Sequence, residues 1–177
     1  MRAKEFFTHL HDIEVNQKYA ETLPYSFHLE MVYNQCTRFK HLLDPTQKKK
    51  EWFEKVPLDI EISIWGHDSI EDARLSYNDI LNRFGEKVAE IIYLCTENKG
   101  RTRDERKPKE FYLELAQNKD AVFVKLCDII ANSLFSLSQN SSMFKKYASE
   151  YKDKVRPYLY TEQYKEMFDF LEAIYKL

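Results

Sequence analysis

Apolar residues recur at steps of three and four along most of the chain, which is the spacing of the buried face of an α-helix. Leu, Glu, Lys and Ala are abundant, whereas only 3 glycines and 5 prolines are available for hairpin turns. The pattern therefore predicts an all-α fold. The expected helices cover residues 3–18, 25–40, 46–63, 68–83, 85–96, 104–118, 120–138, 140–153 and 160–175.

One of these segments also fits a second pattern. Residues Leu58, Ile60, Ile62 and Ile64 alternate with polar residues, as in a half-buried β-strand. We favour a helix because one short strand without a partner would leave its edges unsatisfied. No repeat or linker interrupts the 177 residues, so we expect a single domain over 1–177.

Charge and composition narrow the classes of function. The 27 basic and 29 acidic residues leave a net charge of −2, so no overall field draws the protein to nucleic acid or to an anionic membrane. The longest apolar runs are short for a membrane span, and charges interrupt the N-terminus where a secretory signal needs an apolar stretch. We therefore expect a cytoplasmic protein. Cys36, Cys95 and Cys127 form no CxxC pair, which predicts buried thiols.

The stretch IWGHDSIEDARLSY places four ionisable groups within six residues: His67, Asp68, Glu71 and Asp72. In a helix beginning near Asp68, residues three and four apart share a face, so all four side chains can point into one pocket. Such a cluster is costly to bury without a cation or a hydrogen-bond network. It is therefore either solvated surface or a site.

Two further segments contain polar residues where an apolar helix face is expected. In VKLCDIIANSLFSL, Lys125, Asp128 and Asn132 recur at steps of three and four among core-type residues. In LPYSFHLEMV, His28 stands beside apolar residues, where a histidine that is simply part of the core is the ordinary alternative. Two imidazoles and two carboxylates together make a mixed nitrogen and oxygen set suited to a divalent first-row metal. The candidate ligands are His28, His67, Asp68 and Asp128.

The order H…HD…D resembles that of the HD-domain metal-dependent phosphohydrolases, an all-helical superfamily named after the adjacent pair seen here as His67 and Asp68. HDSIED is similar to the HDxxED signature of the hydrolase domain in RelA/SpoT-type alarmone enzymes. PYSFH resembles that family's PYxxH segment, and VKLCDIIAN resembles its VKLADRLHN-type segment. The resemblance implies an HD-domain helical bundle with a motif-bearing core at about 23–137 and C-terminal packing helices at 140–175.

The length of 177 residues leaves no room for the nucleotide-synthesising domain of the long bifunctional members, so the chain resembles small alarmone hydrolases, including metazoan SpoT homologues. The resemblance implies removal of the 3′-pyrophosphate of ppGpp or pppGpp, which leaves GDP or GTP. Two positions depart from the family pattern. Tyr19 stands where long bacterial enzymes carry an arginine beside the guanine base, and Phe135 stands where a small hydroxyl residue is frequent. Recognition of the base is therefore left open.

The resemblance also assigns roles to residues. The four candidate ligands would bind one divalent ion, with manganese expected, while Glu71 and Asp72 would orient or deprotonate the attacking water. Taken alone, these two carboxylates are equally typical of a helix N-terminus. Lys125 and Asn132 are candidates for binding the substrate, although an ordinary ion pair and a cap would explain them too. The segment ENKGRTRDERKPKEFY is either a solvated surface or a pyrophosphate-binding stretch. Its candidate substrate-binding residues are Arg103, Arg106 and Lys107.

Two other functions remain open for the same residues. An HD-family 5′-nucleotidase or another nucleotide phosphohydrolase would share the ligands and differ in its base pocket, as Tyr19 and Phe135 suggest. A catalytically silent scaffold that senses a nucleotide or binds a protein is the second, although it would have no need of Glu71, Asp72 and Asn132. We expect a small nucleotide as the partner and no nucleic acid, because aromatic residues are not interleaved with the basic run.

Overall fold

The computed structural model describes residues 2–43 and 56–176, and helix is the dominant secondary structure in them. The predicted all-α class is confirmed. Within the described residues, the strands are limited to β1 (Lys18–Tyr19) and β2 (Leu23–Pro24), which pair antiparallel with Lys18 opposite Pro24 and Tyr19 opposite Leu23. This small hairpin was not predicted. Ala20 and Glu21 between its strands have φ values of 48° and 68°, a left-handed turn that the sequence does not mark with glycine.

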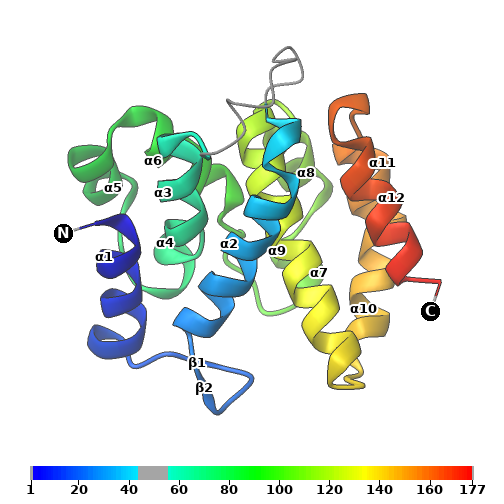
Figure 1. Cartoon of the computed structure of the whole chain (residues 1–177), viewed down its shortest axis with the longest axis horizontal. Coiled ribbons are helices and arrows are strands. Elements are labelled where there is room, and N and C mark those ends of the chain that lie inside the picture. The colour runs from blue at the N-terminus through cyan, green and yellow to red at the C-terminus, as the bar shows by residue number, and fades with distance from the viewer. Residues whose placement is uncertain (1, 44–55, 177) are drawn as a thin grey trace.

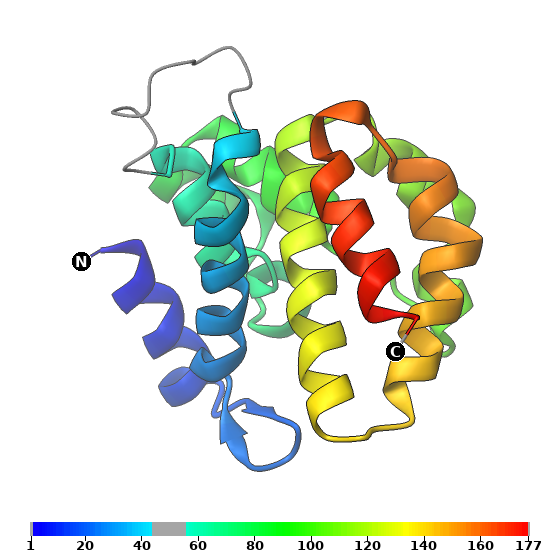
Figure 2. The same cartoon turned by 45° about the vertical axis from the view of Figure 1, so that its right-hand side comes forward.

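The centre of the fold is α9 (Lys119–Ser138), which packs against helices from both ends of the chain. In Figures 1 and 2, α2 (Ser26–Phe39) runs beside α9 through the middle of the molecule. The other helices in contact with α9 are α3 (Leu58–Gly66), α6 (Glu86–Cys95), α8 (Lys109–Leu115), α10 (Met143–Glu150) and α12 (Lys165–Ile174).

Shorter elements complete the two sides of the molecule. Figure 1 shows α1, α3, α5 and α6 on one side of the α2 and α9 pair, with α10, α11 and α12 on the other. The remaining helices are α1 (Ala3–His9), α4 (Ser69–Asp72), α5 (Tyr77–Phe84), α7 (Arg103–Arg106) and α11 (Arg156–Leu159). Single π-helical turns cover Leu10–Glu14 and Tyr151–Val155, and 3₁₀ turns cover Lys40–Leu42 and Glu162–Tyr164.

Two predicted helices are broken in the structure because capping signals lie inside them. In the segment predicted as 68–83, α4 ends at Asp72, Arg74 adopts a φ of 63°, and Ser76 and Asp79 form a reciprocal capping box that starts α5. The segment predicted as 104–118 is divided between α7 and α8 at Pro108, which cannot donate a backbone hydrogen bond. The periodicity of apolar residues continues across both breaks, so it did not reveal them.

Other boundaries shift at the ends of the predicted segments. The first helical segment ends at Glu14 and not at residue 18, while the predicted helix over 160–175 is a 3₁₀ turn followed by α12. Residues 46–55 of the predicted helix 46–63 lie outside the described residues, and α3 begins at Leu58. The preference for helix over strand is confirmed there: Ile60 and Ile64, four residues apart, are buried, and Leu58 is 68% exposed.

The helix α9 is long and apolar enough to cross a membrane by length and composition alone, contrary to the expectation from the short apolar runs of the sequence. In the structure it is the central core helix, and 67% of its most apolar window is buried inside the fold. It also carries the buried charged residues Lys125 and Asp128. Packing within the protein therefore accounts for its apolar character.

The buried side chains form two hydrophobic clusters, and the candidate histidines lie at their border. One cluster is built around α9 and includes Val32 of α2 and Ile64 of α3. The other lies around α1, α5 and α6 and includes Leu29 and Trp65 from the same two helices. His28 precedes Leu29 and His67 follows Trp65 by two residues, so packing of both clusters holds the backbone at each histidine.

Close packing at Gly66, immediately before His67, leads to a stability prediction. A Cβ atom added there would lie 2.5 Å from Cζ of Phe7 and 2.8 Å from Cδ1 of Ile92. We expect Gly66→Ala to lower the free energy of unfolding by about 1–3 kcal/mol, because the buried side chains of Phe7 and Ile92 must shift to admit the methyl group. Urea denaturation followed by circular dichroism measures this, and an unchanged midpoint would contradict it.

Candidate active site

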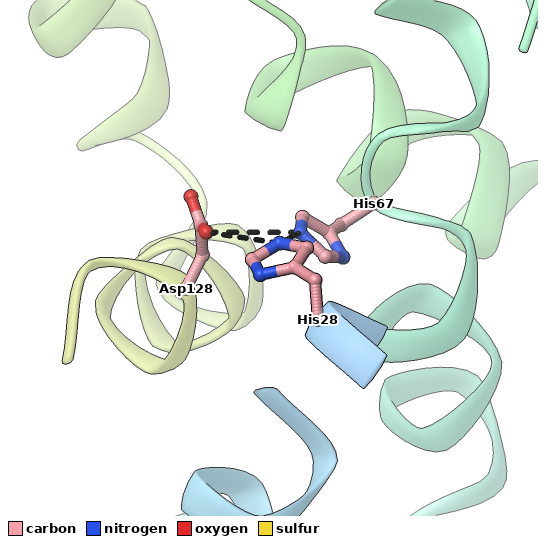
Figure 3. Close-up of side chains that lie close together, drawn as sticks. All are labelled: His28, His67 and Asp128. Atoms are coloured by element: carbon pink, nitrogen blue, oxygen red, sulfur yellow. Dashed lines mark hydrogen bonds and ion pairs between the residues drawn. The ribbon is translucent and has the colours of Figure 1, made fainter. Parts of the chain in front are cut away.

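Three helical segments bring together the side chains that the sequence singled out. His28 lies in the first turn of α2, His67 follows α3, and Asp128 lies in the middle of α9. Ligand-type atoms of these three residues all lie within 4.8 Å of one another. Figure 3 shows the two imidazoles and the carboxylate pointing toward one another. Oδ1 of Asp128 is 3.5 Å from Nε2 of His28 and 3.8 Å from Nε2 of His67.

The carboxylate of Asp68 is the fourth member of this cluster. Its Oδ2 atom lies 3.2 Å from Nε2 of His28 and 3.0 Å from Nε2 of His67. The same oxygen accepts a hydrogen bond of 2.5 Å from the hydroxyl of Tyr25. The structure thus brings the four candidate ligands His28, His67, Asp68 and Asp128 together, although they come from segments far apart in the sequence.

Hydrogen bonding decides which nitrogen of His67 faces the cluster. Its Nδ1 atom lies 2.8 Å from the carbonyl oxygen of Ile64, which can only accept, so Nδ1 carries a hydrogen and Nε2 is the ring nitrogen that faces the cluster. That Nε2 atom is 3.2 Å from Nε2 of His28. Two ring nitrogens this close, facing two carboxylates, require a proton or a metal ion among them.

The charges of the cluster favour a cation. Burial alone would lower the pKa of His67, but the charges of Asp68 and Asp128, together with the hydrogen bonds to Asp68 and to the Ile64 carbonyl, outweigh it and raise the pKa to about 9. Burial would raise the pKa of both carboxyl groups. Instead, His67 and His28 hold the pKa of Asp68 well below its usual range, and Lys125 and His67 lower the pKa of Asp128. The donor set therefore fits a divalent metal ion, which would supply in one place the positive charge that these groups attract.

Glu71 and Asp72 line the cavity beside this cluster. Oε2 of Glu71 accepts a hydrogen bond of 3.1 Å from the backbone N–H of Glu97. The cavity wall partly desolvates Glu71, and together with the charge of Glu97 this raises its pKa to about 7. Partial burial and the charge of Asp68 also raise the pKa of Asp72. A carboxyl group such as that of Glu71 can exchange a proton near neutral pH, as general acid–base chemistry requires.

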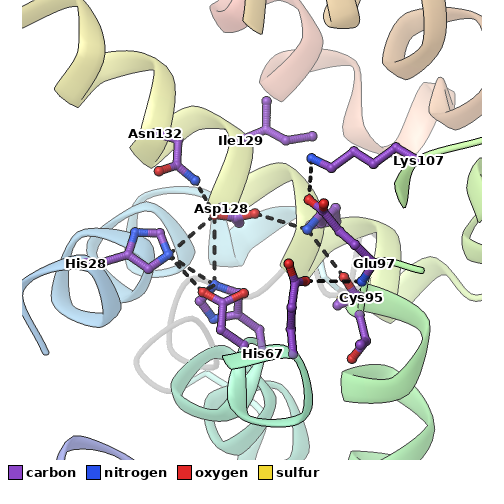
Figure 4. A network of polar contacts seen from close by, with 12 residues as sticks. His28, His67, Cys95, Glu97, Lys107, Asp128, Ile129 and Asn132 are labelled. Atoms are coloured by element: carbon purple, nitrogen blue, oxygen red, sulfur yellow. Dashed lines mark hydrogen bonds and ion pairs between the residues drawn. The ribbon is translucent and has the colours of Figure 1, made fainter. Parts of the chain in front are cut away.

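Lys125 and Asn132 both bind the Asp128 carboxylate. Figure 4 shows the contact between Asn132 and Asp128. Nζ of Lys125 is 3.2 Å from Oδ2 of Asp128 and donates to the carbonyl oxygen of Cys95 at 3.3 Å. Nδ2 of Asn132 donates to Oδ1 of Asp128 at 2.5 Å, and its own Oδ1 accepts from the Tyr19 hydroxyl at 2.8 Å. Both residues line the cavity, and in this arrangement both orient the Asp128 carboxylate.

The predicted substrate-binding cations are paired with two carboxylates in the cavity wall. Nζ of Lys107 is 2.7 Å from Oε1 of Glu97 and 3.1 Å from Oε1 of Glu150, and Nε of Arg103 donates to Oε2 of Glu150. Burial opposes ionisation of Glu150, but Lys107 and Arg103 lower its pKa to about 2. Arg106 pairs with Glu97 at 3.1 Å and, unlike Arg103 and Lys107, does not line the cavity.

The cavity formed by these groups has a volume of about 150 Å³. Carboxylates outnumber cations in its wall, so a polyanionic ligand would need additional positive charge near the ligand cluster. The lining residues are Tyr19, Tyr25, His28, Asp68, Glu71, Asp72, Glu97, Arg103, Lys107, Lys125, Asp128, Ile129, Asn132, Tyr147, Glu150 and Val155.

A second cavity of about 470 Å³ shares Tyr19, Asn132 and Tyr147 with the first. The ring of Tyr19 stacks on His28 at a centroid distance of 4.9 Å and meets Phe135 edge-on at 4.9 Å. Among the described residues, no lysine or arginine lines this cavity. The first cavity therefore presents charged groups and the second presents aromatic and uncharged polar groups, apart from Glu21 in its wall.

Several residues of the site were not found from the sequence. Glu97 was present in the segment described as basic, but its role as the partner of Lys107 depends on tertiary contact. Glu150 and Tyr147 come from α10, for which the sequence offered no functional signal. Tyr25 was visible in the PYSFH segment next to His28, and its contact with Asp68 could have been sought there.

The fold of this chain is similar to that of a solved structure of a metazoan ortholog of SpoT. That structure was reported with the finding that a metazoan ortholog of SpoT hydrolyzes ppGpp and plays a role in starvation responses. The two share 18% sequence identity, the match covers 99% of this chain and 95% of that chain, and the TM-score is 0.69. No protein-family model and no curated protein matches the chain.

Proposed function

We propose that this protein is a metal-dependent phosphohydrolase that removes the 3′-pyrophosphate from ppGpp or pppGpp. The observation that carries the proposal is the convergence of His28, His67, Asp68 and Asp128 beside Glu71, within a fold similar to that of a ppGpp-hydrolysing SpoT ortholog. The resemblance of the HDSIED, PYSFH and VKLCDIIAN segments points to the same reaction.

Several groups of the site then have roles in hydrolysis, among them Asp72, which orients the attacking water. The four ligands would hold a divalent ion, manganese by family resemblance, which would supply positive charge for the phosphoryl group and lower the pKa of a water molecule. Glu71 takes the proton from the attacking water, because its pKa of about 7 suits a base near neutral pH. Arg103 and Lys107 would bind the pyrophosphate in place of part of their contact with Glu150. Lys125 keeps Asp128 ionised and oriented.

We assign the charged part and the uncharged part of the substrate to different cavities. Pyrophosphate fits the first cavity, which holds the cations and the metal ligands, while the uncharged base fits the second, beside Tyr19 and Phe135. Stacking on aromatic rings tolerates any base. We therefore expect this site to discriminate less between guanine and adenine than a site with an arginine beside the base.

The direct test is incubation of the purified protein with manganese and labelled ppGpp, with product analysis over time. Release of pyrophosphate and GDP supports the proposal. The rival is an HD-family 5′-nucleotidase, which the aromatic second cavity also suits. Release of inorganic phosphate from nucleoside monophosphates, with ppGpp left intact, would replace the proposal with this rival.

Phe135 offers a test of where the base lies. Loss of base stacking costs about 1–3 kcal/mol, so we expect Phe135→Ala to raise KM for ppGpp by about 5- to 100-fold with a smaller change in kcat. Steady-state kinetics on ppGpp and on its adenine counterpart measure both values. Tyr93→Ala is the matched control, because Tyr93 is 54% exposed and lines neither cavity. An unchanged KM in Phe135→Ala would place the base elsewhere.

A further inference from the structure

His11 has no assigned role in the sequence, yet the structure buries it completely behind the site. Its Nδ1 atom lies 2.7 Å from Oε1 of Gln17, and its ring stacks on Tyr25 at a centroid distance of 4.6 Å and an angle of 18°. Tyr25 in turn donates to the metal-site carboxylate of Asp68. His11 thus contacts Gln17 and Tyr25, and Tyr25 connects it to a carboxylate of the cavity.

The backbone between His11 and Gln17 has an unusual shape that brings the two side chains together. A π-helical turn covers Leu10–Glu14, and Asn16 follows in the left-handed region with φ of 52°, a conformation that asparagine tolerates better than most residues. The N–H of Gln17 then donates to the carbonyl oxygen of His11 at 2.8 Å. Gln17 is therefore bound to His11 through both its backbone and its side chain.

Gln17 extends this contact to one of the carboxylates of the cavity. Its Nε2 atom donates to Oδ2 of Asp72 at 2.9 Å. Since the amide presents its NH₂ group to a carboxylate, its oxygen faces His11, and Nδ1 of His11 must be the donor. The reverse orientation would place the Gln17 oxygen against the Asp72 oxygen. The hydrogen bonds therefore run in one direction, from His11 through Gln17 to Asp72.

We propose that His11 and Gln17 are positioning residues that set the orientation of the Asp72 carboxylate in the cavity. The competing explanation is that they only stabilise the N-terminal turn, whose Asp12 accepts a hydrogen bond of 2.9 Å from Ser26 at the start of α2. The two explanations differ in what they predict for catalysis. This inference rests on the proposed hydrolase function, in which Asp72 orients the attacking water.

The main test is a double-mutant cycle between Gln17→Leu and Asp72→Asn, with turnover of ppGpp as the readout. Gln17→Leu keeps the side-chain size and removes the donor. We expect it to lower kcat by about 10- to 100-fold, as for a catalytic group held in the wrong orientation, with KM changed less than about 3-fold. In the Asp72→Asn background, Gln17→Leu should have little further effect. Gln117→Leu, the same change on an exposed residue outside both cavities, should leave kcat unchanged.

A second measurement does not depend on turnover. The ¹⁵N chemical shifts of the imidazole report which nitrogen carries the hydrogen, and we expect Nδ1–H for His11 in the wild type and loss of this preference in Gln17→Leu. Additive effects in the cycle, or a hydrogen on Nε2 of His11 in the wild type, would overturn the inference. If the wild type releases no pyrophosphate from ppGpp, the proposed function fails, and the His11 tautomer alone decides whether the hydrogen bonds run toward Asp72.

Discussion

Replacing His67 with alanine should lower kcat/KM for ppGpp by about 10³-fold and remove one metal ligand from the site. The expected size follows from the loss of several kcal/mol of charge stabilisation that a bound divalent ion provides. His67 is fully buried, and its Nε2 atom lies within 3.2 Å of both His28 and Asp68. The Ile64 carbonyl fixes the orientation of this ring.

The prediction is checked by two measurements on the same variant. Equilibrium dialysis against manganese gives the metal content, and product analysis gives turnover of ppGpp. His9→Ala is the matched control, because His9 is exposed and pairs only with Glu14 at 3.6 Å. Full metal content and turnover in His67→Ala would show that the four-residue cluster is not the metal site.

Glu71→Gln is expected to lower kcat by about 10²- to 10⁴-fold while manganese still binds, since the change removes a base and leaves the four ligands intact. Glu71 is the cavity carboxyl whose pKa is raised to about 7, by partial burial and by the charge of Glu97. Retained metal binding together with lost turnover would also exclude the catalytically silent scaffold. Glu114→Gln, the same substitution on an exposed position of α8, is the control.

The pH dependence of the wild type gives a second test of Glu71. A carboxyl group acts as a base only when ionised, so kcat/KM should rise with pH as Glu71 loses its proton and level off above its pKa. The pKa is about 7 in the free protein, and a neighbouring divalent ion would lower it, which places the rise at or below that pH. The rise should disappear in Glu71→Gln. A profile unchanged by this substitution would assign the base to another group.

Several features of the fold were predictable because they depend on local spacing. The apolar periodicity predicted the core helices α2, α6 and α9 with shifts of only a few residues at their ends. The breaks at Arg74 and Pro108 were missed, since capping and turn conformations act over three or four residues inside a longer apolar pattern. The β1 and β2 hairpin was missed because no glycine marks its turn.

The sequence by itself determined the order H…HD…D of the candidate ligands and the helical character of the chain. Both could be predicted because short motifs and helical periodicity are local properties. The tertiary structure alone decided that the Asp68 and Asp128 carboxylates both approach the two imidazoles. It alone decided that Glu97 and Glu150 neutralise Lys107, and that Gln17 reaches Asp72. Most of these contacts join residues dozens of positions apart, and their geometry depends on how whole helices pack, which no local pattern in the sequence records.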